Sequence, residues 1–221
     1  MPLLNIDWNA DGREPLAFLV TWSEVVARKL IEQLPADRFA AETDRVTRAQ
    51  AGEAVAMRDA PAFDLPAPTL LAPARFTDRV SAQVVDAPGG KVAAAVLFVT
   101  PDNKADSDSS LAFAVRAAGL MSAGAGVVIV DALPGPASWA THLHSLTGVY
   151  PITKRPRGTD SPVLAVHPTV QNGGEWFAVW HHNTPAGAPL PTAPLAVRGA
   201  MHLQLDLEAT YAEACANGHI S

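Results

Sequence analysis

Four polar side chains follow two valine-rich runs of the chain and have the chemistry of a hydrolytic site. Asp102, Lys104 and Asp106 come shortly after the first run, and Asp131 directly follows the second. Carboxylates are the oxygen ligands that Mg²⁺ prefers, and a neighbouring lysine can assist a metal-bound water. The residue types therefore offer Lys104, Asp131 and Asp102 as catalytic candidates, and Asp131, Asp102 and Asp106 as candidate metal ligands.

The elements that would position these residues are a strand, a helix and a second strand. Residues 92–99 are apolar without alternation, which predicts a strand buried on both faces. Residues 111–122 predict a helix, and residues 127–130 predict another buried strand. This order predicts two parallel strands joined by a right-handed crossover. The polar turn 102–104 and Asp131 then share the carboxyl edge, where open α/β sheets bind ligands.

The remaining segments predict an α/β fold in which flanking hairpins and terminal helices surround this unit in a mixed sheet. The length of 221 residues predicts a single domain, 1–221. Residues 1–35 predict an N-terminal arm and helix, and residues 76–147 predict a hairpin followed by the βαβ core. Residues 160–221 predict a C-terminal hairpin, a proline-rich crossing and a closing helix. The segment 40–75 gives no clear pattern beyond one or two short strands.

The composition limits the classes of partner. The net charge is −6 with no block of lysine or arginine, so an electrostatic footprint for nucleic acid is missing. No apolar run approaches the roughly 20 residues of a membrane span. Charged residues make up 17% and hydrophobic residues 48%, which predicts a homo-oligomer with unidentified further protein partners. Cys215 is the one cysteine and predicts a buried packing residue in a reducing, cytoplasmic compartment.

Other side chains that could do chemistry lack the spacing for it. His142 and His144 would point about 200° apart on a helix, so they would not chelate one ion. No GxSxG, GxGxxG or Walker-type loop is present. Trp176 and Trp180 would share one face of a strand, where packing in the core or on a hairpin flank is the expected role.

Several motifs in order resemble a large uncharacterised bacterial family. They are VLFVTPDNK, a helix with Arg116 midway, GAGVVIVD, and a proline-rich crossing before LDLEATY. That family is thought to have a restriction-endonuclease-like core of the PD-(D/E)XK type. The resemblance implies the same core here and covers most of the chain, least well between residues 40 and 70.

The same resemblance counts against nuclease chemistry. The glutamate of the family's strand falls on Leu97, and its helix lysine falls on Arg116, which is a poor base. The upstream acidic segment falls near residues 53–55 without a clear aspartate. We expect a catalytically inactive nuclease-like protein that serves as a binding or structural subunit without a cofactor. The alternatives are a magnesium-dependent hydrolase or nuclease with a displaced site at the carboxyl edge, and a small-ligand-binding protein that uses this edge.

Overall fold

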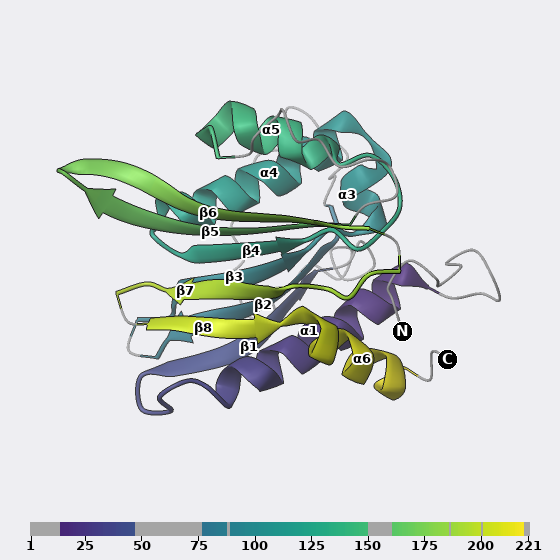
Figure 1. The fold of residues 1–221 in the computed structure, drawn as a ribbon, viewed down its shortest axis with the longest axis horizontal. Coiled ribbons are helices and arrows are strands. Elements are labelled where there is room, and N and C mark those ends of the chain that lie inside the picture. The colour runs from purple at the N-terminus through teal and green to yellow at the C-terminus, as the bar shows by residue number, and fades with distance from the viewer. Residues whose placement is uncertain are drawn as a thin grey trace, which may run out of the picture.

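The computed structural model describes residues 14–46, 77–87, 89–149, 161–185, 187–199 and 201–218. A mixed sheet of order β1-β2-β3-β4-β5-β6 lies at the centre, and a β7–β8 pair lies beside it (Figure 1). The predicted N-terminal arm, most of segment 40–75 and residues 150–160 lie outside the described residues. The helices and strands are α1 (Pro15–Ile31), β1 (Phe39–Val46), β2 (Arg79–Asp86), β3 (Lys91–Phe98), α3 (Pro101–Ala105), α4 (Ser107–Ser122), β4 (Gly126–Val130), α5 (Ser138–Thr147), β5 (Ser161–Gln171), β6 (Gly174–Thr184), β7 (Thr192–Val197), β8 (Met201–Asp206) and α6 (Leu207–Asn217).

The predicted central unit is confirmed as β3, α4 and β4. β3 and β4 pair in parallel, with Leu97 opposite Ile129, and the other neighbouring strands pair antiparallel. The predicted polar turn is instead the short helix α3, because Thr100 and Asn103 form a reciprocal capping box at its start. Asp106, offered by the sequence as a candidate metal ligand, instead caps α4 by accepting from the backbone N–H of Ser109.

The central strands β3 and β4 are buried on both faces, and one apolar core lies on each side of them. In β3, Ala94, Val96 and Phe98 point into one core, and Ala95 and Leu97 point into the other. All five are almost fully buried. The absence of alternation in this run therefore reflects helices or strands on each side of the sheet.

One core is formed where α1 and α6 cover the same face of the sheet. Trp22 of α1 is fully buried, and its indole N–H donates to Thr210 Oγ1 at 3.0 Å. Its ring also contacts Phe98 of β3 and Tyr211 of α6 at centroid distances of 5.0 and 5.4 Å. A buried indole that is both packed and hydrogen-bonded anchors the two terminal helices together.

Within the described ranges, no helix combines the length and the apolar character needed to cross a membrane.

The β7–β8 hairpin corrects the predicted C-terminal region. Residues 185–194 were expected to cross irregularly, yet β7 begins at Thr192 and pairs antiparallel with β8. The predicted closing helix starts at Leu207, with Asp206 as its N-cap. β7 packs so closely on the sheet that Gly126 of β4 faces the backbone carbonyl of Ala196.

Candidate functional site

The structure brings Lys104 and Asp131 together at the carboxyl edge of the parallel pair. Lys104 comes from α3, and Asp131 directly follows β4. Lys104 Nζ lies 2.7 Å from Asp131 Oδ1, and the two side chains are 8% and 0% exposed. The same ammonium donates to the Leu133 carbonyl at 2.6 Å. The lysine thus holds the loop after β4 against α3.

The Asp131 carboxylate is held on its second oxygen as well. The buried Trp139 indole donates to Oδ2 at 2.8 Å. Burial raises the pKa of Asp131, and the Lys104 ammonium and the Trp139 bond oppose that rise. Asp131 therefore joins α3, β4 and α5 through a desolvated carboxyl group.

The other two carboxylates at this edge have separate structural roles. Asp102 Oδ2 accepts from the backbone N–H of Asp78 at 3.0 Å, which ties α3 to the start of β2. Asp106 Oδ1 accepts from the N–H of Ser109 at 2.7 Å as the N-cap of α4. The structure therefore places Asp102, Asp106 and Asp131 at one end of the fold without joining them around a common point.

These residues do not fit the magnesium ion that the PD-(D/E)XK pattern would require. Among the described residues, no group of three or more His, Cys, Asp or Glu side chains could hold a metal ion. Mg²⁺ prefers carboxylate and water oxygens in an octahedron. Asp131 instead faces an ammonium in a site with almost no exposure.

A polar cluster that the sequence did not reveal lies on the face of the sheet that α4 covers. Asp44 of β1 is opposite Ser81 of β2, and Ser81 is opposite Leu97 of β3. Arg116 of α4 donates from Nη2 to Asp44 Oδ2 and to Ser81 Oγ, each at 2.8 Å. Gln83 donates to the same Asp44 oxygen at 3.1 Å. Finding this cluster requires the register of two strand pairs, which no local pattern carries.

Arg116 is a paired cation in this cluster. Its side chain is 17% exposed, and that of Asp44 is 34% exposed. Burial lowers the pKa of Arg116, and Asp44 acts in the opposite direction. A guanidinium stays protonated in proteins, so it can bind or position but cannot accept a proton from water.

A cleft of about 430 Å³ opens beside the buried ion pair. It lies between α3 and the loop after β4, and most of its lining is apolar. This is the edge at which the sequence predicted a ligand crevice. Its lining residues are Pro15, Pro101, Lys104, Ala105, Leu133, Pro134, Gly135 and Pro136.

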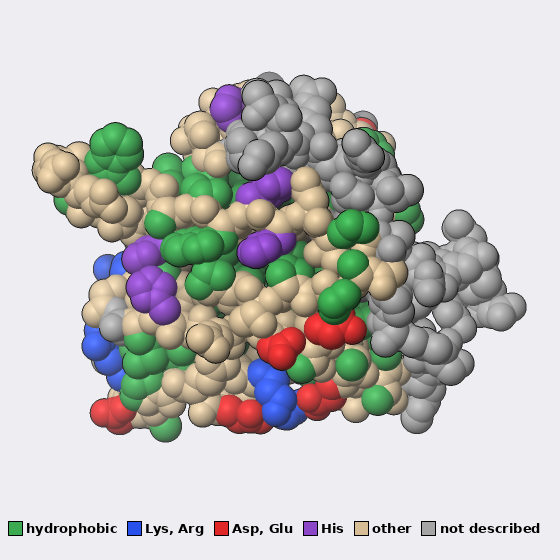
Figure 2. Space-filling model, viewed as in Figure 1, with side chains coloured by type: hydrophobic (Ala, Val, Ile, Leu, Met, Phe, Trp, Pro, Cys, Tyr) green, Lys and Arg blue, Asp and Glu red, His purple; other side chains and the backbone are tan. Residues whose placement is uncertain are grey.

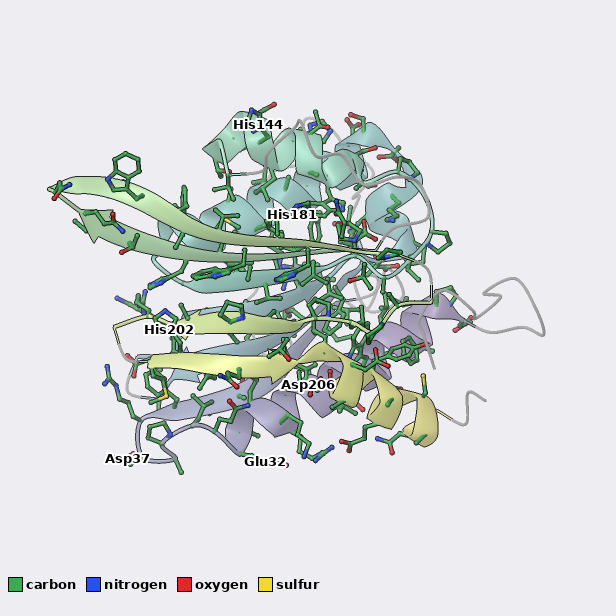
Figure 3. All side chains as sticks on the ribbon, viewed as in Figure 1. Glu32, Asp37, His144, His181, His202 and Asp206 are labelled. Atoms are coloured by element: carbon green, nitrogen blue, oxygen red, sulfur yellow. The ribbon has the colours of Figure 1, made fainter. Side chains whose placement is uncertain are left out.

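The histidines are distributed over different layers. His144 belongs to α5, His181 to β6 and His202 to β8 (Figure 3). His202 Nε2 lies 3.2 Å from Nδ1 of His167 on β5. Partial burial and the neighbouring His202 lower the pKa of His167. The two imidazoles make a hydrogen-bonded contact between the two sheets.

Comparison with protein-family models, with curated proteins and with solved structures gave no match. The restriction-endonuclease-like family stays a prediction from the sequence motifs.

Proposed function

We propose that the protein is a catalytically inactive relative of the PD-(D/E)XK nucleases that acts as a binding or structural subunit. The observation that carries this proposal is the environment of Leu97. Its side chain is fully buried between the sheet and the helix layer, among residues such as Phe113 and Ile129. The resemblance assigns a metal-binding glutamate to this position, where the chain has a packed apolar side chain.

Arg116 supports the same proposal. The resemblance assigns the site lysine to this position, where the guanidinium binds Asp44 and Ser81 instead. Asp44 is thereby neutralised by a cation from the protein itself. The cluster has the composition of a structural contact, since its one carboxylate is already paired.

The decisive experiment is a calorimetric titration of Mg²⁺ and Mn²⁺, with a nuclease assay on the same preparation. We expect no binding at millimolar metal and no cleavage of single- or double-stranded DNA. Asp131→Asn serves as a matched variant once circular dichroism shows that it is folded, because Asp131 is part of the buried ion pair with Lys104. Metal binding that this variant abolishes would instead support a hydrolase with a displaced site at the carboxyl edge.

A gain-of-function variant tests the assignment of the lost site. Leu97→Glu with Arg116→Lys should not restore cleavage, because the family's upstream acidic residue has no clear match in this sequence either. A buried glutamate is costly, so circular dichroism must show that the variant is folded. Leu97→Gln provides a neutral control of similar size. Robust cleavage by the double variant would contradict the proposal.

The cleft at the carboxyl edge favours a second candidate, a small-ligand-binding protein. Its volume and apolar lining are those of a pocket for a compact ligand. A fragment screen by thermal shift tests this candidate, with Ala105→Trp to fill the cleft. Stabilisation of the wild type that this variant loses would support it.

Either role fits the cytoplasm. We propose this compartment because the chain has a single cysteine, which is typical of a reducing environment.

A further inference from the structure

Strand β6 is the edge of the central sheet and lacks the features that protect a free edge. Among the described residues it pairs with β5 alone. Free edges usually carry lysine, proline or other interruptions that prevent pairing with another chain. The sequence of β6, GEWFAVWHHNT, has no lysine, arginine or proline. The opposite edge, β1, carries Glu42, Asp44 and Arg45.

Large apolar side chains are exposed along this strand. Trp176 is 60% exposed, Phe177 38%, Val179 37% and Trp180 38%. The exposures contradict core packing of the two tryptophans, whereas Trp176 lies on the flank of its own hairpin, where its indole N–H donates to the Gln171 carbonyl at 3.1 Å. Figure 2 shows hydrophobic side chains and histidines over the β5–β6 hairpin. Most acidic side chains visible from this side lie in the lower half of the view.

The apolar side chains occupy both faces of the strand. Trp176 and Trp180 lie on the face whose β5 neighbours are Thr169 and Ala165. Phe177 and Val179 lie on the other face, because neighbouring residues of a strand point to opposite sides. A partner that covers only one face would leave the other aromatic side chains in water. A strand added to the edge would contact both faces at once.

We propose that β6 pairs antiparallel with β6 of a second copy, so that two six-stranded sheets join into one. With roughly 150–250 Å² for a fully buried aromatic side chain, the exposed fractions on β6 leave on the order of 400 Å² of apolar area per copy. Two copies therefore contribute about two-thirds of the roughly 1,200 Å² at the lower end of specific interfaces. The paired backbone and polar neighbours supply the rest. The inference does not depend on whether the chain is an enzyme.

The sequence of β6 selects the register. A two-fold axis perpendicular to the sheet must pass through a residue position, so that paired side chains lie on the same face. An axis at Ala178 places Trp176 opposite Trp180 of the second copy. It also places Phe177 opposite Val179, so each aromatic side chain meets an apolar one. Cross-strand aromatic and β-branched pairs of this kind stabilise antiparallel sheets.

The one acidic side chain of the strand fits the same register. Glu175 would lie opposite His181 of the second copy, three positions from the axis. The two carboxylates of the dimer are thereby kept apart, and each faces an imidazole. An axis shifted by one residue to Val179 would instead place Trp176 opposite His182 and Phe177 opposite His181, which leaves both aromatic side chains without an apolar partner.

Sedimentation equilibrium over a concentration series tests the dimer. We expect twice the chain mass of 23.2 kDa for the wild type. Trp176→Glu should raise the dimer dissociation constant at least about 100-fold, as for a central tryptophan hot spot. Trp176→Glu combined with Trp180→Lys should restore the dimer, because each introduced carboxylate faces an introduced ammonium. Val115→Glu, an exposed substitution on α4, is the control and should leave the dimer intact.

Disulfide trapping tests the register. Ala178→Cys should crosslink on oxidation, because the two positions 178 face each other across the axis at a distance a disulfide can span. Val179→Cys should not, since its two copies are offset along the strands. A monomeric wild type at all concentrations would overturn the proposal. A dimer that persists in Trp176→Glu, or that crosslinks through Val179→Cys and not Ala178→Cys, would also overturn it.

Discussion

Lys104 Nζ and Asp131 Oδ1 lie 2.7 Å apart in a site where the two side chains are 8% and 0% exposed. Lys104 and Asp131 therefore neutralise each other at the carboxyl edge. Taking two charges out of water is expensive, and removing one partner of a buried pair leaves the other charge uncompensated. The pair thus makes the edge depend on both residues for its folding.

The first prediction concerns this pair. Asp131→Asn should lower the free energy of unfolding by about 3–5 kcal/mol, because Lys104 keeps a buried charge without a counterion. Lys104→Met combined with Asp131→Asn should lose about 2 kcal/mol less than the sum of the single variants. Urea unfolding of the four proteins measures this coupling energy.

A surface ion pair provides the control for that cycle. Lys29 in the last turn of α1 lies 3.0 Å from Glu32 at its C-cap, and the two side chains are 38% and 52% exposed. Lys29→Met should cost at most about 0.5 kcal/mol, since water screens the pair. Strictly additive losses at Lys104 and Asp131 would show that the buried contact contributes no coupling.

The second prediction compares two glycines. A Cβ on Gly126 would overlap the backbone carbonyl of Ala196 in β7, which cannot move without shifting that strand. Gly126→Ala should therefore destabilise the protein by about 2–3 kcal/mol. Gly119, on the exposed side of α4, has no neighbour within 4 Å of such a Cβ. Gly119→Ala should stabilise it by about 0.5–1 kcal/mol.

Thermal and urea unfolding of both glycine variants distinguish a close approach from helix propensity. Equal effects would mean that β7 does not rest on β4 as described. The opposite signs expected here need no ligand or partner, so they test the fold independently of function.

The part of the fold that the sequence predicted best is local. β3, α4 and β4 follow from two apolar runs and the helical segment between them, all within about forty residues. The closing helix α6 and the β5–β6 hairpin were predicted for similar reasons. The carboxyl edge followed from the parallel pairing itself.

The features that the sequence did not predict depend on packing between distant segments. Pro191 and Pro194 made a strand at β7 hard to predict. β8 carries an alternating signal, in which Leu203 and Leu205 are buried and His202, Gln204 and Asp206 are exposed. The cluster around Arg116 joins α4 to β1 and β2, so its spacing in the chain means nothing by itself. The buried state of Asp131 likewise depends on Trp139, which lies on the following helix.

The third prediction concerns the pKa of His167. Partial burial and His202 lower it below the ordinary value of 6.5. Stability that depends on neutral His167 is therefore fully present above pH 6.5 and is lost as the pH falls through the pKa of the folded state. His202→Leu should raise the pKa of His167 towards 6.5, because one of its two causes is removed.

Nuclear magnetic resonance titration of the imidazole signals measures this shift. Gln204→Ala, on the same strand as His202, is the control and should leave the His167 titration unchanged. A His167 signal that titrates at or above pH 6.5 in the wild type would contradict the close contact between the two rings.

The last prediction concerns the asymmetry of the Arg116–Asp44 pair. The Arg116 side chain is 17% exposed and that of Asp44 is 34% exposed, so the carboxylate can regain water more easily than the guanidinium. Asp44→Asn should therefore cost about 2 kcal/mol, because a buried cation loses its charged acceptor. Arg116→Met should cost about 1 kcal/mol, since methionine keeps much of the apolar stem and Asp44 rehydrates. Urea unfolding at low and high salt measures both. Equal losses, or a larger loss for Arg116→Met, would contradict the prediction, because Asp44 would then depend on Arg116 at least as much as Arg116 depends on Asp44.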